Sequence, residues 1–170
     1  MKYSAKKTAL LGFMLALALI LTIIERMLPF WPFLPPQFGR IGLSNVIVMY
    51  LLFFMDKKEA VIVAILKSIF NLLMRGPIAG LLSLSGGLLS IFFILILLWI
   101  FKNKQAYVPL SVFGAIGHNI GQLIVACLIM QNWLLFVGYF PILLMAGAVF
   151  GTATGILLKI IMPTFNRMYR

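Results

Sequence analysis

The sequence is poor in acidic residues, cysteine and histidine. Its 170 residues include 3 aspartates and glutamates, 1 cysteine and 1 histidine, against 14 lysines and arginines. One cysteine excludes an internal disulfide framework, and one thiol with one imidazole cannot complete a cysteine–histidine metal sphere. We therefore expect no metal site and no cofactor. Chemistry that needs clustered carboxylates, or a nucleophile beside its base, has no visible residues to perform it.

Hydrophobic residues are abundant instead, at 64% of the chain. A spanning helix needs about 20 mainly apolar residues, so six would fill this chain as a single transmembrane domain over residues 1–170. We predict an all-α integral membrane protein of the cell membrane, in contact with lipid. The six expected helices are Thr8–Leu28, Ile41–Met55, Glu59–Met74, Ile78–Phe101, Val108–Met130 and Trp133–Met162. The second and third are short, which indicates tilted, broken or re-entrant segments.

The net charge of +11 could indicate a nucleic-acid partner in a soluble protein. Here the basic residues lie mostly between apolar runs, as topology determinants do, and we expect no nucleic acid. Lysines precede the first helix and occupy the second-to-third and fourth-to-fifth connections. The positive-inside rule then places both termini in the cytoplasm. The basic N-terminus is interpreted as the start of a retained first helix rather than a signal peptide.

The connection between the first two helices combines four prolines with aromatic residues. Proline prevents a helix there and lowers the entropy lost on ordering the segment. One interpretation is a semi-rigid lid over an outward-facing cavity, formed by Trp31, Phe33, Phe38 and Arg40. The alternative is an aromatic anchor at the membrane interface.

The stretch KSIFNLLMR places charge inside an otherwise apolar segment. Lys67, Asn71 and Arg75 recur at every fourth residue and would share one helix face. Lys67 lies roughly 10 Å from either end of its helix, too deep to reach water easily. It is either a cationic wall for an anionic ligand or a lysine satisfied by a neighbouring helix. Glu25 is a possible partner for Lys67 or for an arginine, and Arg75 could simply anchor its helix end.

A second polar group, GHNIGQ, lies in the fifth expected helix. Its hydrogen-bonding side chains share one sector, and its glycines allow another helix to approach closely. Ligand recognition and hydrogen bonding between helices are both open. With Asn45 of the second helix, the predicted ligand-binding residues are Lys67, Asn71, Arg75, Asn45, His118, Asn119 and Gln122.

Small residues at four-residue spacing mark possible packing faces. Gly12 and Ala16 form such a pair in the first helix, and Gly147, Gly151 and Gly155 form a longer series in the sixth. Both patterns suit packing within the chain or docking of another subunit.

Several motifs together resemble a known family. The small-residue first helix (AKKTALLGFMLALAL), the proline-rich loop leading into PPQFGRIGLSNVIVMYLLF, and the stretches GRIGLSN, KSIFNLLMRG and GAIGHNIGQ are similar to the substrate-binding S component of energy-coupling factor (ECF) transporters. More narrowly they resemble the Gx transporter family, often labelled heptaprenyl diphosphate synthase component I. The resemblance covers nearly the whole chain.

The resemblance implies an S-component-like bundle that binds a micronutrient from outside. Such a subunit docks on a transmembrane scaffold subunit that carries two ATPase subunits, and here Gly12 and Ala16 would be contact candidates. The absence of a Walker A motif agrees with ATP hydrolysis by partners. We expect the ligand to be a small anionic compound, such as a vitamin, a quinone precursor or an isoprenoid-related acid.

The synthase label implies a different activity, which the residues do not favour. Prenyl elongation usually needs clustered aspartates that hold magnesium on a diphosphate. The chain's acids are Glu25, Asp56 and Glu59. We therefore expect no enzyme, and the alternative function is a non-catalytic membrane subunit associated with a prenyl diphosphate synthase or another lipid enzyme.

Overall fold

The computed structural model describes residues 5–27, 43–101 and 106–168. These residues form an all-α structure, which confirms the predicted class and helix order. The elements are α1 (Ala5–Met27), α2 (Leu43–Phe54), α3 (Lys57–Arg75), α4 (Pro77–Phe101), α5 (Tyr107–Met130) and α6 (Leu134–Met168).

The helix ends follow local chemistry. Asp56 is the N-cap of α3, and its backbone N–H donates to Glu59 Oε2 at 3.0 Å, so α3 begins earlier than predicted. Between α3 and α4, Gly76 adopts a φ of 88°, which favours glycine, and Pro77 follows at the first position of α4. The C-terminal end of α6 lies at Met168, past Pro163 and beyond the end predicted at Met162.

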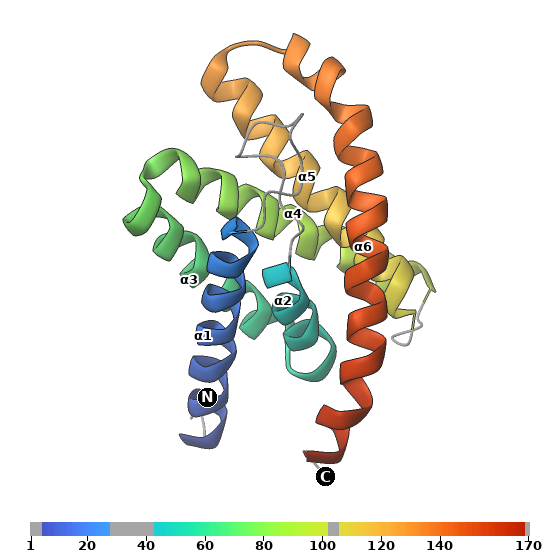
Figure 1. The fold of residues 1–170 in the computed structure, drawn as a ribbon. Helices are drawn as coiled ribbons and strands as arrows, with labels where there is room; N and C mark the ends of the chain where they lie inside the picture. Colours follow the sequence, from blue (N-terminus) through green and yellow to red (C-terminus); the bar gives the residue numbers. More distant parts are fainter. Residues whose placement is uncertain (1–4, 28–42, 102–105, 169–170) are drawn as a thin grey trace.

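The other five helices pack around α2, which contacts each of them. α4 packs against α3 and α5, while α6 lies along α5 and also reaches α2. α4 crosses the bundle at a steep angle to α1 and α6, and α1 begins at the same end of the bundle at which α6 finishes (Figure 1). The short helix α2 is therefore enclosed by longer ones.

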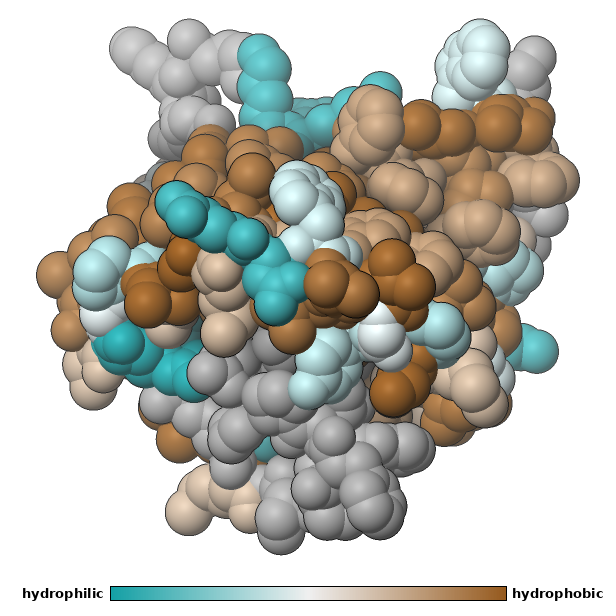
Figure 2. Space-filling view, turned by 90° about the horizontal axis from the view of Figure 1, so that it is seen from above, coloured by the Kyte–Doolittle hydropathy of each residue, from teal (hydrophilic) through white to brown (hydrophobic). Residues whose placement is uncertain are grey.

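Four helices are long and apolar enough to cross a membrane, namely α1, α4, α5 and α6. The 12 residues of α2 extend only about 18 Å, less than the hydrocarbon thickness of about 30 Å. Seen from above, much of the described surface is hydrophobic (Figure 2). Large exposed apolar side chains include Phe13, Phe92, Trp99, Met145, Val149 and Ile160. The chain is a membrane protein, and a lipid-facing exterior accounts for this surface.

An ion pair joins the start of α1 to the junction between α2 and α3. The Lys7 ammonium lies 2.5 Å from Glu59 Oε1 and 3.7 Å from Asp56 Oδ2. The Glu59 side chain is almost fully buried, so Lys7 supplies the counter-charge that its carboxylate needs. This contact fixes the α2–α3 junction beside the N-terminal end of the bundle.

Glycines bring the backbones of α4, α5 and α6 close together. A Cβ added at Gly151 would lie 2.5 Å from the Val112 Cα, and one at Gly121 would lie 2.6 Å from the Ser85 carbonyl oxygen. Side chains at these positions would collide with main-chain atoms that cannot rotate away. The packing role considered for the α6 glycines is thus confirmed, and the α5 glycines serve the same purpose.

Candidate functional site

Polar side chains collect in the interior of the bundle, where they need partners to offset the loss of water. They come from all six helices. The buried ones above the α2–α3 junction are Thr22, Glu25, Ser44, Asn45, Lys67, Ser68, Asn71, Ser83, Ser90, Ser111, His118, Asn119, Gln122 and Thr154.

Lys67 is 3% exposed and is held by α2. Its Nζ donates to Ser44 Oγ and to Asn45 Oδ1, both at 3.1 Å. Glu25 of α1, also buried, lies within electrostatic range of the ammonium. These contacts agree with the interpretation in which a neighbouring helix, here α2, satisfies the lysine.

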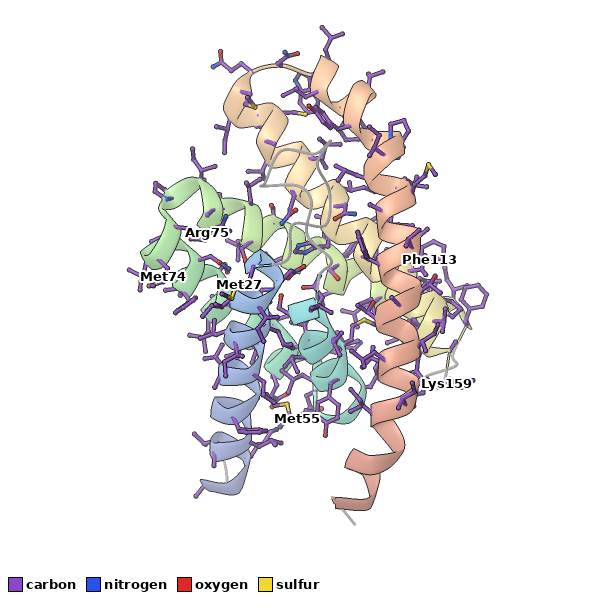
Figure 3. The ribbon with its side chains drawn as sticks, viewed as in Figure 1. Met27, Met55, Met74, Arg75, Phe113 and Lys159 are labelled. Carbon is purple, nitrogen blue, oxygen red and sulfur yellow. The ribbon has the colours of Figure 1, made fainter. Side chains whose placement is uncertain are left out.

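The other two residues of the Lys67 face differ in burial: Asn71 is buried, and Arg75 lies at the end of the helix. Asn71 Nδ2 donates to the Lys67 carbonyl oxygen and to Ser83 Oγ, each at 3.0 Å, and so joins α3 to α4. Arg75 is the last residue of α3, half-exposed at the turn into α4 (Figure 3). In the same view Met55 and Lys159 lie toward the end of the bundle that carries the termini.

His118 and Gln122 form a pair on α5. Gln122 Nε2 lies 3.1 Å from His118 Nε2, so with the amide as donor the ring proton belongs on Nδ1. That Nδ1 is buried without a hydrogen-bond partner among the described residues and faces Gly86 of α4. A Cβ at Gly86 would lie 2.7 Å from the ring, so glycine there is what admits the imidazole.

A cavity lies between α2, α4, α5 and α6. Its volume in this structure is about 10 Å³, room for about one water molecule, and it is partly open to the surroundings. The lining residues are Asn45, Met49, Ser90, Ser111, Gly114, Ala115, His118, Asn119, Ala146, Gly147, Phe150 and Thr154. Half of them carry hydrogen-bonding side chains and the rest are small or apolar, a mixture typical of small-molecule sites.

The comparison with protein families supplies the context for this interior. Residues 14–161 match the family described as heptaprenyl diphosphate synthase component I. The chain belongs to this family. The matched range takes in all six helices, from within α1 to well into α6. No curated protein matches the chain.

In this component I family member, the cavity brings together three of the seven predicted ligand-binding residues: Asn45, His118 and Asn119. Lys67, Asn71 and Gln122 are buried nearby and bind other protein groups rather than lining it. Arg75 lies outside it as well. The predicted lid residues Trp31, Phe33, Phe38 and Arg40 fall outside the residues that the structure describes.

Three hydroxyl residues of the cavity were missed. Ser111 Oγ and Thr154 Oγ1 lie 2.6 Å apart across α5 and α6, and Ser90 projects from α4. A signal existed for Ser111, because Ser111, Ala115, His118 and Gln122 recur at helical spacing along one face of α5. Ser90 and Thr154 are isolated hydroxyls in apolar helices, and only the packing of the helices gives them a shared location.

The buried side chains of this interior are mainly hydrogen-bonding groups. Within residues 5–27, 43–101 and 106–168 there is no group of three or more histidine, cysteine, aspartate or glutamate side chains placed to hold a metal ion. The acids Asp56 and Glu59 are both close to Lys7 at the α2–α3 junction. The cavity's amides, hydroxyls and imidazole suit recognition of a bound molecule.

Proposed function

We propose that the chain is the substrate-binding membrane subunit of an ECF-type, ATP-dependent importer for a small vitamin-like compound. The observation that carries the proposal is the partly open cavity lined by hydrogen-bonding side chains from four helices. In a bundle that serves only as a membrane anchor, such groups would be costly without a compensating role. The chain would be non-catalytic, with six helices in the cell membrane and both termini in the cytoplasm.

The partners in this proposal are a transmembrane scaffold subunit and two ATPase subunits. Gly12 and Ala16 lie on the exposed face of α1, and a Cβ at Gly12 would meet no atom within 4 Å. Small residues allow a second helix to approach closely within a bilayer. This face therefore suits docking of the scaffold subunit.

A second candidate function rests on the family's description. Under it, the chain is a non-catalytic membrane subunit associated with a prenyl diphosphate synthase. The two functions differ in what co-purifies with the full chain from its native membranes in a mild detergent. We expect a membrane subunit and two ATPases by mass spectrometry, whereas recovery of a soluble prenyl synthase without ATPases would favour the second function.

The α1 face gives a sharper form of this experiment. We expect Gly12→Leu to lower recovery of the scaffold subunit about tenfold or more, because the new side chain would hold the partner helix away. The matched control is Gly138→Leu on α6, where a Cβ also meets no atom within 4 Å. Equal recovery with both variants would rule out docking at Gly12.

A further inference from the structure

The cavity between α2, α4, α5 and α6 is small, and its wall is partly polar. Its volume of about 10 Å³ is the space that about one water molecule needs. The polar side chains that line it are each at most 8% exposed: Asn45, Ser90, Ser111, His118, Asn119 and Thr154. Buried polar groups need hydrogen-bond partners, and the bonds that these side chains already form show which of their atoms remain for a bound molecule.

The protein's own contacts orient the two cavity amides in opposite senses. Asn45 Oδ1 accepts a hydrogen bond from the Lys67 ammonium at 3.1 Å, so the Asn45 Nδ2 remains as a donor. Asn119 Nδ2 donates to the Leu143 carbonyl oxygen at 2.9 Å, so the Asn119 Oδ1 remains as an acceptor. Because an ammonium only donates and a carbonyl only accepts, neither amide can be turned round without losing its contact.

The hydroxyl groups of the cavity are constrained in the same way. Thr154 Oγ1 donates its single proton within α6, to the carbonyl oxygen of Phe150 at 2.9 Å or of Gly151 at 3.0 Å. The 2.6 Å contact between Ser111 and Thr154 then uses the Ser111 proton, which leaves Ser111 Oγ as an acceptor. The Ser90 hydroxyl forms no hydrogen bond with a described residue and is available as a donor.

Two donors and two acceptors therefore remain, and a water molecule accepts two hydrogen bonds and donates two. Buried waters usually make about three such bonds. We propose that this cavity binds one ordered water molecule with these four groups as its partners. The water accepts from Asn45 Nδ2 and Ser90 Oγ. It donates to Asn119 Oδ1 and Ser111 Oγ, and so extends the hydrogen bonds of Lys67 from α2 to α4 and α5.

The water site goes beyond the proposed function and does not depend on it. Pockets for small organic molecules usually have volumes of about 300–1,000 Å³, whereas this cavity holds about one water. If the chain is the binding subunit of an importer, a vitamin-sized compound enters the cavity only after the surrounding helices move apart. Its polar atoms then replace the water. A chain that co-purifies with no ATPase would refute transport and leave the water site standing.

The water is detected by NMR on the purified, isotope-labelled full chain in lipid nanodiscs. We expect cross-relaxation between water and the Asn45 side-chain amide protons, which a rotating-frame experiment separates from proton exchange by its sign. The Asn45 signal is assigned by its loss in Asn45→Asp, a variant that keeps an oxygen for Lys67. Deuterium relaxation dispersion of the solvent measures how long the buried water stays.

Two variants each remove one partner of the water. Ser90→Ala and Ser111→Ala should each shorten its residence time about two- to tenfold, because each deletes one hydrogen bond. The double variant should shorten it by about the product of the two factors. The matched control is Ser85→Ala on α4, whose hydroxyl donates to the Leu82 carbonyl oxygen and is not part of the cavity wall. It should leave the residence time unchanged.

Three results would overturn the proposal. The first is the lack of a long-lived water beside the Asn45 amide in the unsubstituted chain, a result that depends on no variant. The second is cross-relaxation of this amide with lipid acyl protons in place of water. The third is one and the same residence time in Ser90→Ala, Ser111→Ala and Ser85→Ala, with backbone amide spectra showing that all three are folded.

Discussion

Replacing Lys67 by methionine is expected to lower the free energy of unfolding by about 1.5–3 kcal/mol, the usual contribution of hydrogen bonds to a charged group. Methionine retains the length of the side chain but cannot donate to Ser44 or Asn45. The carboxylate of Glu25 would also lose the positive charge that acts on it. Reversible unfolding of the purified full chain in mixed micelles, followed by circular dichroism, measures the difference.

The matched control is Lys58→Met, at an exposed position at the start of α3. It should change the free energy of unfolding by no more than about 0.5 kcal/mol. The double variant Lys67→Met with Asn45→Leu should cost less than the sum of the two single changes, because both remove the same hydrogen bond. Equal costs at Lys58 and Lys67, or strict additivity with Asn45, would contradict the role of Lys67 as a buried link between α2 and α3.

The sequence predicted the helices well because long apolar runs and capping residues are local signals. The order of all six elements is as expected, and most predicted ends lie within a few residues of the observed ones. The exception is the C-terminal end of α6. The predicted end at Met162 precedes Pro163, whereas the helix continues through this proline to Met168.

The candidate site was predicted less completely, since a sequence shows which residues share a face and not what that face meets. The stripe through Lys67 and Asn71 is buried, as its spacing indicated. Its charge left two interpretations of Lys67 open, a wall for an anion and a lysine satisfied by a neighbouring helix. The neighbouring helix α2 supplies Ser44 and Asn45 as acceptors, and that information exists only in the tertiary structure.

The glycines show the same division between local and tertiary information. Gly12 and Gly151 occur in similar small-residue patterns, and no feature of the sequence distinguishes them. In the structure, Gly12 faces open space on α1, whereas Gly151 lies against the main chain of α5. The same small-residue pattern therefore marks an open surface on α1 and a close helix contact on α6. Substitution by alanine at each glycine distinguishes the two cases.

Gly151→Ala is expected to lower the free energy of unfolding by about 1–3 kcal/mol through overpacking. The added methyl group would lie 2.5 Å from Val112 Cα and 3.0 Å from Val112 N, so α6 would have to move away from α5. The cavity between these helices includes Gly147, one turn away, and Thr154, so the same movement would change its shape. Unfolding of the purified full chain in mixed micelles measures the loss of stability.

Gly12→Ala is the matched substitution. It adds the same methyl group to a helix interior where no atom lies within 4 Å, so the higher helix propensity of alanine should leave stability unchanged or raise it by up to about 1 kcal/mol. Because alanine has that advantage at both sites, the difference between the two variants isolates the contact with α5. Similar unfolding free energies for both would mean that the α5–α6 interface yields to a methyl group, and that the glycines of α6 do not determine how closely these helices pack around the cavity.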